Sequence, residues 1–269
     1  MKTILFPTDF SMNSMHAIRY GLELFKDEKD MHYILLNAYI DPSAGAAMTY
    51  DLGDHMQIIS QQMLDSLEEK LDDDYGYSDI SFELLSVYGD LPGALKPIVK
   101  NKEVDLIVMG ASGAGSPHIS IFGSTAYACM KEATCPVLTI PLQTNIKSPE
   151  LIGIASENKF KGDESFLSPI LKIASIHNSW VMGVSVNTKE SIDTKKNAKD
   201  VLEENMDIEF INLNTKDPVT GIEFAIGKYK LDLLAIIIKE RPLLDRIFHK
   251  SVSKQIAKQI AIPILSLHS

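Results

Sequence analysis

The two halves of this 269-residue chain repeat one another, and this repeat constrains the fold more than any other feature. The run Val104–Ile107 (VDLI) corresponds to Leu231–Leu234 (LDLL), 127 positions later. At the same spacing, Cys135–Leu138 (CPVL) corresponds to Ile262–Leu265 (IPIL). A match at constant spacing without gaps indicates two tandem copies of one structural unit.

The spacing between the copies changes along the chain, and this change locates an insertion. Ile4–Asp9 corresponds to Ile152–Glu157 at a spacing of 148, so the first copy has 148 − 127 = 21 additional residues between its first and third strands. We expect most of them within Asp41–Asp54. The polar segment Leu142–Pro149 separates the copies, which predicts two domains, 1–143 and 150–269.

Within the first copy, short apolar runs alternate with segments of helical periodicity. Strands are expected at Ile4–Phe6, Tyr33–Ala38, Ile80–Val87, Leu106–Met109 and Val137–Ile140, and helices at Ser11–Lys26, Met56–Leu71, Leu95–Lys100 and Ser124–Lys131. This alternation predicts an α/β fold in which each copy forms an open, mostly parallel five-stranded sheet flanked by helices.

The last strand of each copy is apolar and would leave an exposed sheet edge that promotes aggregation. We therefore expect Val137–Ile140 and Pro263–Leu267 to bring the halves together as an intramolecular pseudo-dimer. A homodimer of whole chains is a second arrangement that would cover such edges.

Composition narrows the range of partners. The net charge of −10 and the isoelectric point near 5.2 argue against nucleic acid or an anionic membrane as a partner. The only two cysteines, Cys129 and Cys135, lack the spacing of a redox or metal motif, so buried structural thiols are expected. Without an apolar run of about 20 residues or a recognisable export signal, the protein is expected in the cytoplasm.

A glycine pattern follows the fourth strand. Met109-Gly110-Ala111-Ser112-Gly113 is followed, nine residues later, by Gly123-Ser124-Thr125 at the start of a helix. Glycines here allow positive φ angles and a close approach of backbone N–H groups to a phosphate. The helix start adds unpaired N–H groups and a favourable dipole. The alternative is a glycine-rich turn followed by a Ser or Thr helix cap.

The second copy discriminates between these interpretations. At the positions of the three glycines it has Ile237, Glu240 and Lys250, while the flanking strand and helix patterns persist. Glycines needed only to connect the strand to the helix would have been retained in at least one place. The comparison therefore favours a phosphate site in the first half and predicts an empty second half.

Four motifs together resemble the universal stress protein family, in its tandem form with an ATP-binding first domain. They are Pro7–Ser11 (PTDFS), Gly89–Pro92 (GDLP), the glycine pattern and Cys135–Leu138. The resemblance implies a Rossmann-like fold of the adenine nucleotide alpha hydrolase type, with ATP, alone or with Mg²⁺, as the ligand. The residues it implies are Pro7, Asp9 and Ala38 around the adenosine, Met109 and Gly110 at its edge, and Gly113, Gly123, Ser124 and Thr125 at the phosphates.

From the residues alone, Asp9 at the end of the first strand suits a ribose or adenine contact, with a helix-capping role as the alternative. Ala114–Phe122 contains no Lys or Arg, only His118, so little or slow hydrolysis of ATP is expected. The sequence thus predicts a stress-response regulatory protein that holds ATP, without assigned catalytic or metal-binding residues. A nucleotide-free interaction scaffold and a slow ATPase are the alternatives.

Overall fold

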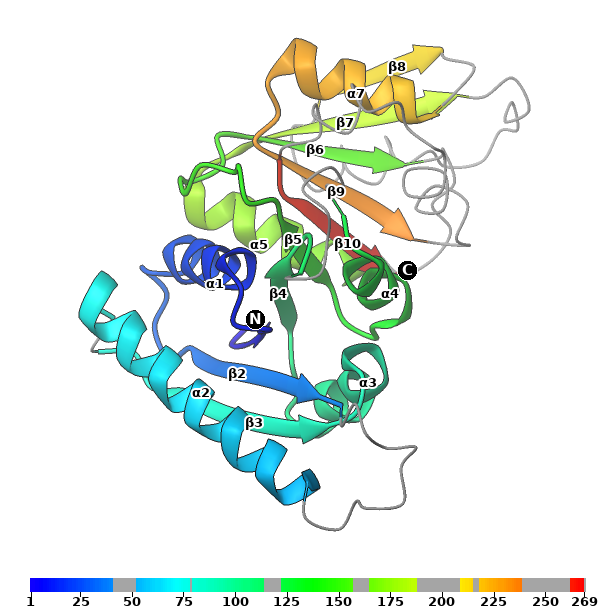
Figure 1. Cartoon of the computed structure of the whole chain (residues 1–269). Coiled ribbons are helices and arrows are strands. Elements are labelled where there is room, and N and C mark those ends of the chain that lie inside the picture. Colours follow the sequence, from blue (N-terminus) through cyan, green and yellow to red (C-terminus); the bar gives the residue numbers. More distant parts are fainter. Residues whose placement is uncertain are drawn as a thin grey trace.

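The computed structural model describes residues 1–40, 52–77, 79–113, 122–156, 165–187, 209–214, 218–238 and 262–268. Within these residues the strands form a single ten-stranded sheet with the order β3-β2-β1-β4-β5-β10-β9-β6-β7-β8. The first half of the chain forms one side of this sheet and the second half forms the other (Figure 1).

The first half alternates strands and helices as the sequence predicts. Its elements are β1 (Thr3–Pro7), α1 (Met12–Leu24), β2 (His32–Tyr39), α2 (Leu52–Tyr75), β3 (Phe82–Tyr88), α3 (Leu91–Asn101), β4 (Leu106–Gly110), α4 (Ser124–Glu132) and β5 (Val137–Ile140). Side-chain caps fix two of the helix starts: Ser11 accepts a hydrogen bond from the Ser14 N–H before α1, and Asp90 accepts one from the Gly93 N–H before α3.

The second half repeats this order. Its described elements are β6 (Leu151–Ser156), the 3-10 turn η1 (Ser165–Leu167), α5 (Ser168–His177), β7 (Trp180–Asn187), β8 (Glu209–Asn214), α7 (Pro218–Tyr229), β9 (Leu233–Ile238) and β10 (Ile264–His268). Between β2 and β3 lie 42 residues, 40–81, against 21 residues, 188–208, between β7 and β8. The 21 additional residues of the first copy are therefore in this connection; residues 41–51, where most were expected, lie outside the described residues.

Strand registers confirm the repeat. Ile107 pairs with Val137 in the first half, and Leu234 pairs with Ile264 in the second, each 127 positions later. Strand pairing inside each half is parallel. The predicted α/β class with two five-stranded units is therefore confirmed, with the addition that the two sheets are continuous.

The halves meet through their last strands, as predicted. β5 and β10 pair antiparallel, with Leu138 opposite Leu265. Two equivalent hydroxyl groups reinforce this joint across a local two-fold relation: Thr139 Oγ1 donates to the Ile264 carbonyl at 3.1 Å, and Ser266 Oγ donates to the Val137 carbonyl at 3.2 Å. Because the pairing is antiparallel, the carboxyl edges of the two halves face opposite ends of the molecule.

The repeated aspartates have the same structural role in both copies. Asp105 Oδ2 accepts hydrogen bonds from the N–H groups of Lys2 and Thr3 at 2.6 and 3.0 Å. Asp232 Oδ2 accepts them from Glu150 and Leu151 at 2.9 and 3.0 Å. Each carboxylate therefore ties the start of a first strand to the start of a fourth strand, which explains why the aspartate is retained in both halves.

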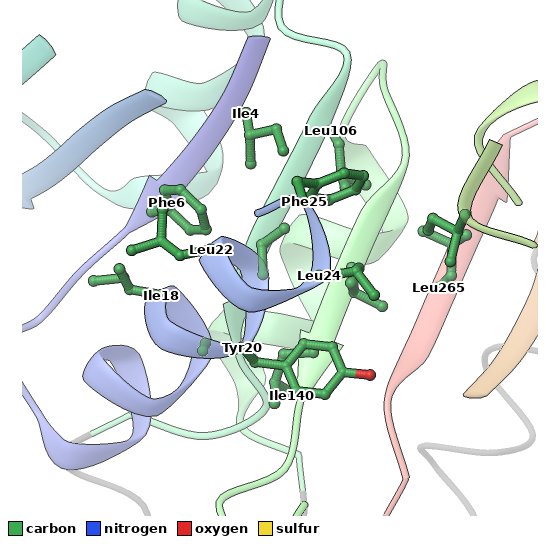
Figure 2. Packing of buried hydrophobic residues seen from close by; sticks show 14 of the residues in the cluster. Ile4, Phe6, Ile18, Tyr20, Leu22, Leu24, Phe25, Leu106, Ile140 and Leu265 are labelled. Carbon is green, nitrogen blue, oxygen red and sulfur yellow. The ribbon is translucent and has the colours of Figure 1, made fainter. Parts of the chain in front are cut away.

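Apolar side chains cover both faces of the sheet. On one face, α1, α2 and α5 contribute to one core cluster that spans the two halves. Figure 2 shows part of it: Phe6 of β1 lies beside Ile18 and Leu22 of α1, whereas Leu265 of β10 lies farther along the cluster, towards the right of the view. The other face has two clusters, one under α3 and α4 and one under α7.

Among the residues that the structure describes, no helix is both long and apolar enough to cross a bilayer.

Candidate functional site

A cavity of about 490 Å³ opens at the carboxyl edge of the first-half sheet. All nine residues predicted from the sequence line it: Pro7, Asp9, Ala38, Met109, Gly110, Gly113, Gly123, Ser124 and Thr125. They come from the ends of β1, β2 and β4, from the loop after β4 and from the first turn of α4. Segments up to 118 positions apart in the sequence (125 − 7) therefore form one pocket.

The strand order explains why the pocket lies here. From β1 the chain continues to its neighbour β2 on one side, whereas β4 lies on the other side of β1. This is the topological switch point of an open parallel sheet, where connections leave in opposite directions and a crevice remains. The volume lies within the range of roughly 300 to 1,000 Å³ that is typical of small-molecule sites.

Two glycines bring backbone close to the pocket wall. A Cβ atom at Gly110 would lie 3.1 Å from the backbone C and O of Asn13, and one at Gly113 would lie 2.8 Å from Asp9 Oδ2. A side chain at Gly110 would therefore press on α1, and one at Gly113 would displace the Asp9 carboxylate. The expectation of positive φ is wrong for them, because the described glycines with positive φ are Gly76 and Gly89.

The start of α4 faces this pocket through Gly123, Ser124 and Thr125. Gly123 is the N-cap residue, and among the described residues no side chain caps this end of the helix. The Gly123 N–H donates to the Ala111 carbonyl at 2.8 Å, which fixes the helix start against the end of β4. The proposed alternative, a Ser or Thr cap, is therefore wrong for this helix, whose first-turn N–H groups are suited to an anion.

Asp9 lies at the opposite wall. Its Oδ1 accepts hydrogen bonds from the Ser11 backbone N–H at 3.1 Å and from Ser11 Oγ at 2.5 Å. Ser11, not Asp9, caps α1. The carboxylate is thus held by the cap, while its Oδ2 lies on the side of Gly113.

A second layer of polar groups supports this wall, and it was not predicted from the sequence. Thr8 Oγ1 and Ser14 Oγ lie 3.0 Å apart, and both residues line the cavity. Asn37 Nδ2 donates to the Thr8 carbonyl at 2.8 Å, and Ser60 Oγ donates to Asn37 Oδ1 at 2.8 Å. Because the two hydrogen bonds of Asn37 join residues 29 and 23 positions apart, no local sequence pattern indicates them.

The loop after β4 is also held by α1. Asn13 Nδ2 donates to the Ser112 carbonyl at 2.8 Å and also contacts Ser112 Oγ. Asn13 was not identified from the sequence. The hydrophilic start of α1 gave no indication that one of its side chains faces a loop about 99 residues away.

A third helix start completes the lining. Gly89, with φ of 130°, Asp90, Leu91 and Pro92 contribute to the cavity from the turn before α3. The Gly89 N–H donates to the Tyr39 carbonyl at 2.8 Å, which places this turn beside the end of β2. The GDLP motif was noted in the sequence but was not assigned to the site.

The charged side chains that line the pocket are acidic. Asp9 and Asp90 are carboxylates, and the described lining residues include no Lys, Arg or His. His118, the histidine of the loop, lies outside the described residues. An anionic ligand would thus be held here by backbone N–H groups or together with a cation, rather than by basic side chains.

The two cysteines are buried, as expected, and lie in the core under α4. Burial raises the pKa of each thiol to about 12. They are therefore structural rather than reactive groups.

In the second half, the residue at the Gly110 position is Ile237, which packs against the core shared by the halves. The positions of the other two glycines, Glu240 and Lys250, lie outside the described residues. The loss of the glycines therefore remains a comparison of sequences.

Comparisons with known proteins were made for the whole chain. Residues 1–141, more than half of it, match the model of the universal stress protein family. A universal stress protein of Methanocaldococcus jannaschii is 26% identical over 141 residues, which is 52% of this chain and 81% of that protein.

Two solved structures resemble the whole chain. A universal stress protein from Archaeoglobus fulgidus has a TM-score of 0.70 at 18% identity, covering 98% of this chain and 95% of the other. A functionally unknown protein from Pseudomonas aeruginosa has a TM-score of 0.59 at 12% identity, covering 100% and 92%. At these identities the structures support the tandem α/β fold alone. The match of residues 1–141 to the family model places the chain in the universal stress protein family.

Proposed function

We propose that the first half binds an adenine nucleotide, ATP in particular, and that the protein acts as a nucleotide-dependent regulator rather than an efficient enzyme. One observation carries this proposal: nine residues chosen from the sequence for an adenosine and its phosphates all line one cavity. The adenosine would lie near Pro7, Asp9 and Ala38. The phosphates would meet the backbone at Gly113 and the first turn of α4.

Binding without efficient turnover follows from the chemistry of the lining. Phosphoryl transfer to water needs a group that orients the water and cations that stabilise the charge on the γ-phosphate. The described lining offers two carboxylates and no basic side chain. We therefore expect ATP to be held, with a turnover far below the typical enzyme rate of about 10 per second.

The same charges give Mg²⁺ a role. Asp9 and Asp90 would repel an unneutralised triphosphate, whereas a divalent cation bound to the phosphates reduces its charge. ATP binding is expected to be stronger with Mg²⁺ than with a chelator. AMP, with fewer charges, is expected to depend less on the cation.

The test is isothermal titration of the full chain with Mg-ATP. We expect a stoichiometry near one per chain, because the glycines are present only in the first half. Gly113→Val should abolish binding, since its Cβ would lie 2.8 Å from Asp9 Oδ2. Gly227→Val is the matched control, because a Cβ at Gly227 in α7 has no atom within 4 Å among the described residues.

Each outcome has a distinct meaning. A stoichiometry near two would show that the second half also binds, and unchanged affinity in Gly113→Val would show that the loop is only a turn. No binding of ATP, ADP or AMP would favour the interaction scaffold. cAMP, with which another universal stress protein was solved in complex, should be titrated alongside to define the ligand.

A further inference from the structure

The second half of the chain holds the far end of the helix that faces the pocket. His268 Nε2, at the end of β10, lies 2.9 Å from the carbonyl oxygen of Met130 in the last turn of α4. A carbonyl can only accept, so the histidine donates from Nε2. The last four carbonyls of a helix lack partners within it, and His268 satisfies one of them from the other half of the molecule.

Apolar contacts accompany this hydrogen bond. Ile238, paired with His268 between β9 and β10, packs against the first-half cluster under α3 and α4. Phe122, directly before the N-cap Gly123, packs against that cluster and also against the second-half cluster under α7. Residues at both ends of α4 therefore take part in contacts between the halves, and Figure 1 shows α4 close to β10.

This arrangement is not reciprocal between the copies. The position equivalent to His268 in the first half is Pro141 (268 − 127), whose side chain has no hydrogen-bond donor. Pro141 therefore cannot provide the side-chain cap that His268 provides. The half that supplies it is the one that has lost the loop glycines.

We propose that His268 is a positioning residue for the nucleotide pocket: by capping α4 from the second half, it holds the helix so that its first turn meets the phosphates. This inference rests on the proposed function. A nine-residue helix is short and stiff, so a shift at its last turn is transmitted to its first. The second domain thus contributes to binding at a distance from the ligand.

The test uses two substitutions in the full chain, His268→Phe and His268→Gln. Phenylalanine fills the space without a donor, whereas the glutamine amide can donate to the Met130 carbonyl. In His268→Phe we expect ATP to bind about threefold to tenfold more weakly, the range given by loss of one hydrogen bond. Adenosine, which does not reach α4, should bind unchanged, and His268→Gln should restore ATP binding.

Hydrogen exchange of the α4 amides in the ligand-free protein gives a second measurement that needs no nucleotide. His268→Phe should exchange these amides about threefold to tenfold faster, and His268→Gln at close to the original rate. Ile170→Val is the control, because it weakens the buried core under α5 without contacting α4. It should leave both the α4 amides and the ratio of ATP to adenosine affinity unchanged.

Two results would overturn the inference. One is an equal loss of ATP and adenosine affinity in His268→Phe, which would mean that the histidine only stabilises the domain. The other is unchanged exchange of the α4 amides. If the unsubstituted protein binds no nucleotide, the proposed function fails, and the exchange rates alone decide whether His268 positions α4.

Discussion

Replacing Asp232 by alanine tests how the start of the second domain is held. The Asp232 side chain is 17% exposed, and its carboxylate accepts from two backbone N–H groups and from Lys147 Nζ at 2.7 Å. A hydrogen bond to a charged group contributes about 1.5 to 3 kcal/mol. The Glu150 N–H is at an exposed position and can be hydrated when the carboxylate is removed, so only the hydrogen bond from the Leu151 N–H is counted in full. The ion pair with the half-exposed Lys147 adds less than about 1 kcal/mol to the stabilisation.

The expected loss is therefore about 1.5 to 4 kcal/mol of unfolding free energy. At about 2 to 4 °C per kcal/mol, the melting temperature should fall by roughly 3 to 16 °C. Differential scanning calorimetry measures this, with Lys147→Ala and the equivalent Asp105→Ala as matched variants. Asp105→Ala should resemble Asp232→Ala, because both carboxylates accept from two strand-start N–H groups.

The pH dependence provides an independent check. Burial of Asp232 alone would raise the pKa of its carboxyl, but hydrogen bonds from Lys147 and the two backbone N–H groups outweigh it and lower the pKa. A carboxyl with a lowered pKa in the folded state stabilises the protein above its ordinary value near 3.8. That stability is lost as the pH falls through the folded pKa. The gap between the wild type and Asp232→Ala should therefore narrow below about pH 4. A gap constant down to pH 2, or a loss no larger than in Lys147→Ala, would refute the reasoning.

Three further predictions concern the rest of the molecule. Gly110→Ala should lower the free energy of unfolding by about 1 to 3 kcal/mol, because the added methyl would lie 3.1 Å from backbone atoms in the first turn of α1. Urea unfolding measures this loss, and an unchanged free energy would mean that α1 can move away. Burial lowers the pKa of His16 and of His268, so stability should fall as the pH decreases below about 6.5, and a pH-independent melting temperature between 5 and 7 would contradict this. Cys129 and Cys135, buried and with pKa values raised to about 12, should react with a thiol reagent only after unfolding, and rapid labelling of the native protein would show that the core opens.

The sequence predicted the strands and their pairing well because these depend on periodicity and repetition. Val137–Ile140 was predicted as a strand with the bounds the structure has, and its partner near Ile264 follows from the constant spacing of 127 residues. Burial on both faces leaves a continuous apolar run, which a sequence shows directly. The last strand of each half would be exposed if the halves were separate, which is why the two halves were expected to pair.

The candidate site was predicted only where residues follow strand ends or carry a glycine. Thr8, Asn37 and Ser60 form a hydrogen-bonded chain from the end of β1 through β2 to α2, and neither Asn37 nor Ser60 belongs to a local motif. The predicted positive φ angles of Gly110 and Gly113 are wrong, although the backbone at both residues lies close to neighbouring groups, Asn13 and Asp9. Such details depend on which helix packs over which strand. Tertiary contacts decide this packing, and the neighbouring residues in the sequence do not.

The antiparallel joint between β5 and β10 has a consequence for how the two domains can diverge. Because the joint turns the carboxyl edges toward opposite ends of the molecule, a ligand bound at one edge does not contact the other edge. What both copies must keep is the seam: Leu138 against Leu265, and the matched hydroxyls of Thr139 and Ser266. The residues at one carboxyl edge of such a tandem chain can therefore change without loss of the fold, provided that each last strand continues to cover its partner's sheet edge.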